Sequence, residues 1–498
     1  MQGRYAPARG TRLTAIPLAS PERVDSLKRF LWRLDSPPGL LAMFLLAFLV
    51  RLAIAPSTGY YADLRIFQGW AVRLENVGLD GFYAGGWADY PPGYLYVLWL
   101  IGKISSPPGF VLLKLPAILA DLGLAWIAGT FAQRIAPGPV AGRLPVRALV
   151  AAAVLFNPAI ILVGTVWGQV DAVPAVFVLW SLLLLFTGRQ SVRREIFAFL
   201  LFAVAFAIKP QAGFVLPIML YALYREHIRN RSLAEVATGL ASIALLGAVS
   251  LGLLFVTALP FGLRPLELVR FYSESASTYP FTSANAFNLW GAVGFWRHDS
   301  GSGSFVAVAG VPALYIGMLA LAAGIVVVVW RAHREIERGA DQVLVLTVAA
   351  AAVSLLAFAL LTRMHERYMF YALALLAPLI FMRPIRLVLA GLSCLYGLNL
   401  WWVYAYSNSR GDLGRPCSLP GPGCLGFDSI FGGFATDSWQ KKFFSLAVVA
   451  IAIAVAWFGV RWAGRSRAGG PDPGRVQSAR VTAPPPSGPV ARPRSPTS

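Results

Sequence analysis

The chain has 498 residues, of which 57% are apolar and only 13% are charged. Soluble domains are about 45 to 50% apolar and about 25% charged, so the composition excludes a water-soluble protein and requires a bilayer. The formal charge of +20 does not indicate nucleic-acid binding, because the arginines lie in short loops and at both termini rather than on one face with interleaved aromatic residues.

Residues 1–36 read as a basic cytoplasmic leader, with seven Lys or Arg between Arg4 and Arg33. Positive charge next to a spanning helix favours the cytoplasmic side. A cleaved signal peptide would place a short apolar stretch near the start, but the first apolar run begins only near Leu40 and is long enough to span. The membrane domain is therefore expected to cover residues 37–463.

Apolar segments recur along this domain, and most are long enough to cross roughly 30 Å of hydrocarbon at 1.5 Å per residue. Backbone groups in lipid must be satisfied internally, which implies helices. We predict an all-α, polytopic integral membrane protein with 12 or 13 transmembrane helices. The expected spans are 39–56, 92–106, 110–132, 147–165, 170–187, 195–209, 211–224, 233–259, 307–330, 342–362, 368–382, 385–406 and 443–462.

Arg-rich loops alternate with loops rich in aromatic and acidic residues, and the positive-inside rule places the Arg-rich set in the cytoplasm. One conflict remains: an odd number of crossings must separate Pro56 from Arg134, yet two apolar segments lie between them. Either the piece from Pro92 to Ile104 does not cross fully, or the segments flanking Lys209 form one broken helix. The expected long outer loops are 57–92, 260–306 and 407–442, and the short ones are 167–171, 209–211 and 362–368.

The segment 464–498 is rich in Pro, Gly, Ser and Arg and is predicted to be a disordered cytoplasmic tail. Cys417 and Cys424 share an outer loop, where a disulfide is permitted. Cys394 lies in an apolar run and is expected to pack as a small apolar residue.

The first outer loop combines aromatic residues with two acids, Asp63 and Asp89. Aromatic faces stack on sugar CH surfaces, and a carboxylate near a sugar hydroxyl can act as a general base. The simpler alternative is an aromatic belt at the membrane interface with solvated acids. Phe67 and Trp70 follow Asp63 at helical spacing, which predicts a short helix on the membrane surface.

Two further polar groups interrupt apolar runs. Gln169 and Asp171 precede an apolar segment, where Asp171 can act simply as a favourable charge at a helix start. Lys209 is followed by Pro210, and a lysine near mid-membrane would cost about 2.5 to 3.5 kcal/mol. We therefore expect an exposed helix end at Lys209 rather than a buried charge.

The densest polar cluster between two apolar segments contains Arg363, His365, Glu366 and Arg367. Arginine and histidine beside a helix start form an anion site, and forked guanidinium hydrogen bonds suit a phosphate. The alternative is a charged loop whose side chains snorkel to the interface. No zinc-ligand spacing or nucleotide-phosphate loop is recognisable, which disfavours nucleotide chemistry.

In chain order these motifs resemble the GT-C superfamily of polyprenyl-phosphate-sugar-dependent glycosyltransferases. The pattern is similar to that of the dolichyl-phosphate-glucose glucosyltransferases of N-glycan assembly and their bacterial mannosyltransferase-like relatives. The residues that carry it are Asp63 through Trp70, Asp89-Tyr90-Pro91-Pro92, the segment Tyr279 through Trp290, and His365-Glu366-Arg367, where the family has His-Glu-Lys.

The resemblance implies a GT-C-like hexosyltransferase of the cell membrane with its active site on the extracytoplasmic face. Its donor is a polyprenyl-phosphate sugar, with mannose or glucose favoured and arabinose and galactose-type donors open; its acceptor is a glycan or glycolipid. Asp63 is then the general base, with inversion at the sugar. The expected donor-phosphate residues are His365, Arg367, Arg363 and Lys209, and the expected positioning residues are Asp89, Tyr90, Asp171, Gln169, Trp70 and Glu366.

No organic cofactor is expected, and a divalent cation is neither required nor excluded. Membrane lipids are expected partners, and nucleic acid is not. A transporter or flippase of lipid-linked saccharides is the alternative function, because it would also present aromatic and acidic groups to sugars. A non-catalytic subunit of a membrane assembly is a third reading.

Overall fold

The computed structural model describes residues 21–86, 88–189, 191–301, 303–409, 430–431 and 437–465. The start of the predicted leader, most of the loop 407–442 with Cys417 and Cys424, and nearly all of the predicted tail 464–498 lie outside these residues.

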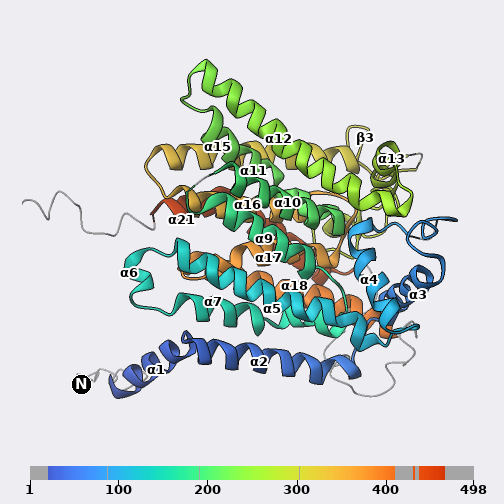
Figure 1. Cartoon of the computed structure of the whole chain (residues 1–498), viewed down its shortest axis with the longest axis horizontal. Helices are drawn as coiled ribbons and strands as arrows, with labels where there is room; N and C mark the ends of the chain where they lie inside the picture. The colour runs from blue at the N-terminus through green and yellow to red at the C-terminus, as the bar shows by residue number, and fades with distance from the viewer. Residues whose placement is uncertain are drawn as a thin grey trace, which may run out of the picture.

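The described chain is almost entirely helical, with long helices lying side by side (Figure 1). The first half contains α1 (Pro21–Leu34), α2 (Pro37–Ile54), α3 (Tyr61–Val77), α4 (Pro92–Ile104), α5 (Phe110–Ile135), α6 (Gly138–Ala141), α7 (Val146–Leu155), α8 (Pro158–Ile161), α9 (Ala172–Phe186), α10 (Val192–Ile208), α11 (Leu216–Leu223) and α12 (Leu233–Ala258). The second half contains α13 (Pro265–Ser275), α14 (Leu289–Val293), α15 (Ala313–Glu337), α16 (Gln342–Leu360), α17 (Phe370–Leu376), α18 (Arg383–Ser409), α20 (Trp439–Ala454) and α21 (Val460–Arg465).

The described residues also include four short strands: β1 (Ser283–Ala284), β2 (Val306–Val308), β3 (Val311–Pro312) and β4 (Met364–His365). Strand β1 pairs in parallel with β4, and β2 pairs antiparallel with β3. The β1–β4 pair joins two loops that are far apart in the sequence.

Helix α16 is the centre of the bundle, and its most apolar window is 89% buried. Asp341 caps its first turn by accepting hydrogen bonds from Val343 and Leu344 N–H groups. The run Ala349–Ala352 is fully buried, and such small side chains let neighbouring helices approach closely.

The structure is that of a polytopic membrane protein, as predicted. Within the described residues, seven helices are long and apolar enough to span, or eight if the bent pair Val146–Leu155 and Pro158–Trp167 is one span. This count is below the 12 or 13 expected, because other predicted spans form short helices: α9 has 15 residues, α11 has 8 and α17 has 7. The long spans contain α2, α5, α12, α15, α16, α18 and α20.

Helix α4 supports the first resolution of the conflict between Pro56 and Arg134. It has 13 residues, so it rises only about 20 Å and is too short to cross. Its glycines let it pack closely, since a Cβ at Gly102 would lie 2.5 Å from the Ala71 carbonyl oxygen, and one at Gly93 would lie 2.6 Å from Ala207. Thus α4 packs against α3 and against the end of α10.

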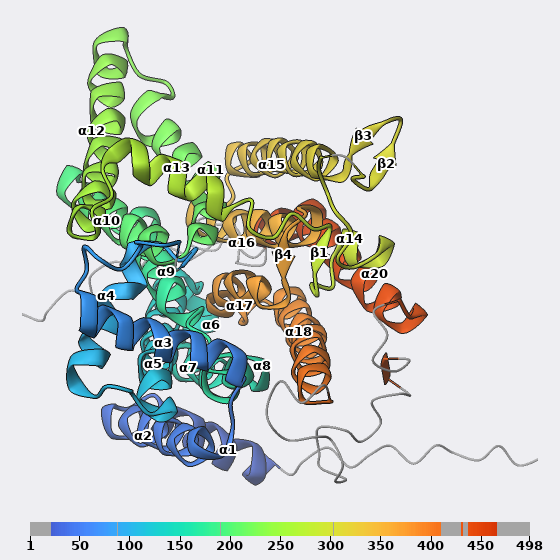
Figure 2. The same cartoon turned by 90° about the vertical axis from the view of Figure 1, so that its right-hand side faces the viewer.

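Two of the loops predicted to be outer, 57–92 and 260–306, lie near each other in the structure. Helices α3, α4 and α13 gather at one end of the bundle, away from the N-terminus (Figure 1), and Figure 2 shows this end face on. At the opposite end, Arg225 and Arg229 both hydrogen-bond Glu337, which joins two of the predicted Arg-rich loops. The predicted surface helix after Asp63 is α3.

Cys394 was expected to pack, and this is wrong. It is a free cysteine with an exposed side chain. In a spanning helix such as α18, one face points to lipid rather than to the bundle, so an apolar run does not by itself imply burial within the protein.

Candidate active site

A cavity of about 630 Å³ lies at the end of the bundle shown in Figure 2, and we call it the main cavity. It is bounded by α3, by the ends of α10 and α13, by the start of α15 and by the segment 361–368. Most predicted site residues line it, namely Asp63, Trp70, Asp89, Tyr90, Gln169, Lys209, Arg363, His365 and Arg367. Asp171 and Glu366 do not line it and lie buried behind it, in contact with Lys209 and Arg367.

Asp63 is in the first turn of α3. Its Oδ2 accepts hydrogen bonds from Trp167 Nε1 at 2.8 Å and from Gln169 Nε2 at 2.5 Å. Within the described residues no group hydrogen-bonds Oδ1. One carboxylate oxygen is therefore held in place while the other stays open to accept a proton.

The tight turn at Gly168 places both donors on Asp63. Gly168 has a φ of +96°, a left-handed conformation that glycine adopts without steric cost. A Cβ there would lie 2.7 Å from the Leu64 side chain. Trp167 also stacks on Tyr60, with ring centroids 4.3 Å apart, which fixes the indole N–H.

Lys209 orients Gln169. Its Nζ donates to Asp171 Oδ1 at 2.9 Å and to Gln169 Oε1 at 3.4 Å. Because an ammonium group can only donate, it holds the amide oxygen on its own side and turns the amide nitrogen toward Asp63. Asp171, Lys209, Gln169 and Asp63 thus form one continuous polar chain.

The expected exposed helix end at Lys209 is only half right. Helix α10 does end at Ile208, but the lysine is 4% exposed and the side chain of Asp171 is fully buried. The buried charge is tolerated because it is paired. Asp171 is the residue before α9, where a negative charge is favourable, but its side chain makes no capping hydrogen bond there.

His365 and Arg367 enter the main cavity from the segment before α17. Arg367 Nη1 donates to Glu366 Oε1 at 3.0 Å, while its buried Nε has no hydrogen-bond partner among the described residues. Burial lowers the pKa of Arg367, but the carboxylates of Asp63 and Glu366 outweigh it and raise that pKa well above the usual value. Arg367 is therefore a permanent cation.

His365 differs from its neighbour in charge. Burial, Arg367 and Lys209 lower its pKa well below the usual value, so the imidazole is neutral near pH 7. The ring lies between Tyr279 and Tyr368, at centroid distances of 4.9 and 5.3 Å. A neutral imidazole can donate one hydrogen bond, but it brings no positive charge to an anion.

Arg363 is engaged elsewhere. Its backbone is left-handed, with a φ of +62°, and its Nε and Nη2 donate to the two oxygens of Asp299 at 2.9 and 3.2 Å. Its Nη1 donates to the Ala276 carbonyl oxygen at 2.7 Å. Burial raises the pKa of Asp299, but hydrogen bonds from Arg363, Thr362 and Ser300 prevail and lower it. Arg363 thus ties the start of β4 to Ala276 at the end of α13 and to Asp299 after α14.

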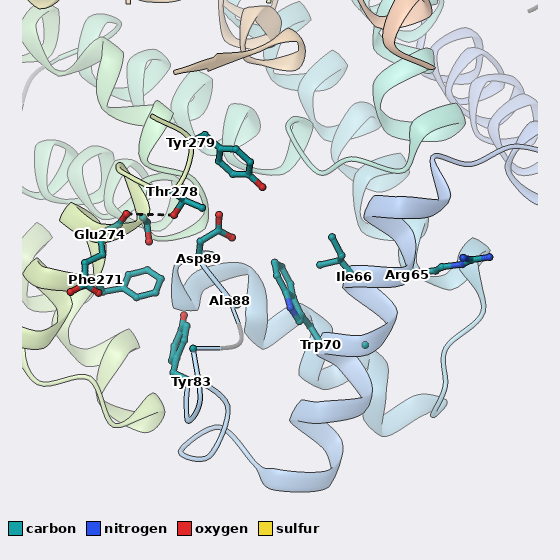
Figure 3. A pocket seen from close by; sticks show the side chains of 13 residues that line it. Arg65, Ile66, Trp70, Tyr83, Ala88, Asp89, Phe271, Glu274, Thr278 and Tyr279 are labelled. Carbon is teal, nitrogen blue, oxygen red and sulfur yellow. Dashed lines mark hydrogen bonds between the residues drawn. The ribbon is translucent and has the colours of Figure 1, made fainter. Parts of the chain in front are cut away.

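Trp70 and Asp89 line both the main cavity and a second pocket beside it, whereas Tyr90 lines the main cavity alone. The second pocket has a volume of about 850 Å³ (Figure 3). The Tyr90 ring lies 5.2 Å from that of Trp70 and 5.7 Å from Lys209 Nζ. Burial raises the pKa of Asp89, against the opposing effects of a backbone hydrogen bond and Arg367.

Sequence reasoning missed Trp167 and Asp299. Trp167 lies two residues before Gln169, so an aromatic donor near a predicted polar residue was the available signal. Asp299 lies in a long loop without periodicity, and nothing in the sequence pairs it with Arg363. Among the described residues, no three His, Cys, Asp or Glu are grouped so as to hold a metal ion.

Residues 57–262 match the model of the PIG-U family, described as a GPI transamidase subunit. This segment contains Asp63, Gln169, Asp171 and Lys209 but not the segment 362–368. No curated protein matches the chain significantly. Among solved structures, an archaeal oligosaccharyltransferase, AglB from Archaeoglobus fulgidus in complex with an inhibitory peptide and a dolichol-phosphate, aligns at 12% identity with a TM-score of 0.37. That alignment covers 89% of this chain and 58% of the archaeal one.

Proposed function

We propose that the protein is a membrane glycosyltransferase that moves a hexose from a polyprenyl-phosphate donor to a glycan or glycolipid acceptor. The observation that carries this proposal is the open Oδ1 of Asp63 in the same cavity as the guanidinium of Arg367. A fixed base and a fixed cation in one cleft suit a reaction in which a hydroxyl attacks and a phosphate leaves.

In the proposed step, the acceptor hydroxyl oxygen bonds to the anomeric carbon of the donor while its proton passes to Asp63 Oδ1. The bond from that carbon to the phosphate oxygen breaks, and the polyprenyl phosphate leaves with the electron pair. Attack opposite the leaving group inverts the anomeric centre. No oxidant, reductant or further reactant is needed.

The residues then take distinct roles. Arg367 compensates the charge of the leaving phosphate, and His365 donates a neutral hydrogen bond to it or to the sugar. Lys209 and Gln169 position Asp63 rather than bind phosphate, because the lysine is already paired with Asp171. Arg363 is not included among the phosphate ligands, since Asp299 holds its guanidinium.

The shape of the main cavity supports a lipid-linked donor. Leu314 and Met318 line it from α15, a membrane-spanning helix, and Met318 is 53% exposed. An isoprenoid chain can therefore lie against α15 while its phosphate reaches Arg367. By the positive-inside rule, the end of the bundle that holds this cavity is extracytoplasmic.

The first experiment measures transfer of radiolabelled sugar from polyprenyl-phosphate mannose and polyprenyl-phosphate glucose to a membrane lipid extract by the purified full-length protein. Asp63→Asn keeps the size of the side chain and removes its basicity, so transfer should fall by about 10² to 10⁴-fold. Asp80→Asn, an exposed acid after the same helix, is the matched control and should transfer normally. Full activity of folded Asp63→Asn would refute the proposed base.

The PIG-U match favours a second candidate, a non-catalytic subunit of a membrane assembly. That reading predicts no transfer by the isolated wild type with either donor and co-purification with other membrane proteins from its native host. Transfer by the isolated wild type, lost in Asp63→Asn, would exclude it. Movement of lipid-linked saccharide across liposomes without transfer would instead indicate the transporter alternative.

A further inference from the structure

The second pocket lies beside the main cavity, and we call it the outer pocket. It is formed by α3, the loop before α4 and the end of α13, and its lining includes Gly69, Trp70, Tyr83, Asp89, Phe271 and Glu274 (Figure 3). Trp70, Asp89 and Tyr279 line both cavities. A molecule in the outer pocket can therefore extend past Asp89 into the main cavity.

The chemistry of the outer pocket differs from that of the main cavity. Aromatic side chains and two acids surround it, whereas the cations Lys209 and Arg367 line only the main cavity. Arg65 lies at its edge and points away from Asp89 (Figure 3). Asp89 lines both cavities, but Glu274 lines only the outer pocket, and Lys209 and Arg367 are there to offset the acids only in the main cavity. The outer pocket therefore disfavours the donor's anionic part. Aromatic faces and carboxylate acceptors suit a neutral polyol.

The outer pocket also lies outside the membrane-spanning part of the chain. None of its lining residues belongs to a candidate span, whereas α15 lines the main cavity. Ligand pockets generally measure about 300 to 1,000 Å³, so its volume of about 850 Å³ has room for more than one sugar ring. A water-soluble chain fits this position better than a lipid tail.

We infer that the outer pocket is the acceptor subsite and that it binds a neutral oligosaccharide, whose terminal hydroxyl Asp89 guides toward Asp63. This inference rests on the proposed function. It divides the substrates between two cavities: the lipid phosphate on the cationic, membrane-facing side and the glycan on the acidic, aromatic side.

Gly69 offers a direct test. It lies within α3, and a Cβ at this position would meet nothing within 4 Å. The variant Gly69→Phe therefore adds a ring to open space, and it replaces glycine in a helix, which does not disfavour folding. Asn76→Phe is the matched control, because Asn76 is exposed on the same helix and does not line the outer pocket.

The first readout is binding of fluorophore-labelled mannotetraose and maltotetraose to the full-length protein in detergent, with labelled tetralysine as the peptide probe. We expect the wild type and Asn76→Phe to bind one tetrasaccharide, and Gly69→Phe to bind it at least tenfold more weakly. Binding of neither tetrasaccharide at millimolar concentration, or equal binding by Gly69→Phe, would overturn the inference. So would binding of tetralysine alone.

The second readout is sugar transfer to the bound tetrasaccharide. Gly69→Phe should raise the acceptor KM at least tenfold, with a smaller effect on the donor KM. A wild type that transfers sugar with an acceptor KM unaffected by Gly69→Phe would overturn the inference and leave the proposed function intact. A different result would refute the proposed function but leave the glycan-binding site intact: the wild type binds the tetrasaccharide, Gly69→Phe weakens this binding, and the wild type transfers no sugar.

Discussion

Two buried ion pairs lie in different regions of this bundle. Arg51 and Asp121 meet at 3.0 Å between α2 and α5, and both side chains are 0% exposed. Lys209 and Asp171 meet at 2.9 Å beside the main cavity. The hydrogen bonds of the first pair stay in the bundle interior, since Arg51 otherwise donates to the Ala47 carbonyl oxygen of its own helix. The second pair is linked by hydrogen bonds through Gln169 to Asp63.

The difference shows that a buried charge does not identify a site by itself. Both pairs have similar distances and similar burial, and both are expensive to break. Only Lys209 lies on a cavity and on a polar path to an open carboxylate. We therefore distinguish a candidate positioning residue from a structural one by its contact with a cavity, and not by its burial.

The largest expected effect comes from breaking each pair. Arg51→Met and Lys209→Met each leave a buried carboxylate without its cation, which should lower the free energy of unfolding by about 3 to 5 kcal/mol. Only Lys209→Met should also lower kcat in the fraction that remains folded. Denaturant unfolding in detergent and sugar transfer measure the two effects.

The double variant Lys209→Met with Asp171→Leu is the control for that comparison. Removing both charges should restore most of the stability, but not the activity, because Gln169 stays unanchored. A comparable loss of kcat in Arg51→Met would abolish the distinction between the two regions.

Arg367 and Arg363 sharpen the same comparison within one loop. Arg367→Ala removes a cation with an open donor, and a hydrogen bond to a charged group contributes about 1.5 to 3 kcal/mol, so donor kcat/KM should fall by about 10- to 150-fold. Arg363→Ala instead breaks the brace to Asp299 and should lower thermal stability more than donor kcat/KM. Arg367→Lys should recover part of the loss. Donor kinetics unchanged in Arg367→Ala would remove this residue from the phosphate site.

Gln169→Leu should produce a smaller loss. The variant takes one hydrogen bond from Asp63 Oδ2 and leaves the one from Trp167, so kcat should fall by about tenfold while the donor KM changes little. Steady-state transfer assays measure the two constants. If kcat is unchanged, the chain from Lys209 to Asp63 has no positioning role.

The smallest expected effect concerns pH. His365 has a pKa well below its usual value in the folded protein, while an unfolded histidine titrates near pH 6.5. As the pH falls below about 6.5, the unfolded state takes up a proton that the folded state does not, so stability decreases. Above about pH 6.5 the ring is neutral in both states, so His365 causes no loss of stability there. His365→Gln should flatten the decrease between pH 7.5 and 5; an unchanged slope would show that His365 titrates normally.

The comparison of the two pairs also explains how far the sequence alone could lead. The helix after Asp63 and the break at Lys209 followed from local patterns. The interaction partners of the site residues could not be predicted from these patterns. Arg363 and Arg367 look equivalent in the sequence, and only the left-handed backbone at Arg363 and the distant Asp299 separate them.

The exposure of Lys209 was mispredicted for a related reason. The cost of a charge in the membrane depends on its partner, and here the partner Asp171 lies just before α9, so that α9, a loop and α10 separate it from Lys209 in the sequence. The Trp167 hydrogen bond to Asp63 likewise depends on how α3 lies across the end of the bundle. Local patterns fix helices and their ends, whereas contacts between helices depend on packing.

The parallel pair of β1 and β4 has a consequence for biosynthesis. It joins the loop after α13 to the segment that carries His365 and Arg367, and those residues are translated long after Asp63. A ribosome-bound chain can therefore insert α2 through α13 before Arg367 has been made. Under the proposed function, a chain that ends before this residue has the base Asp63 but lacks the cation that we assign to the leaving phosphate.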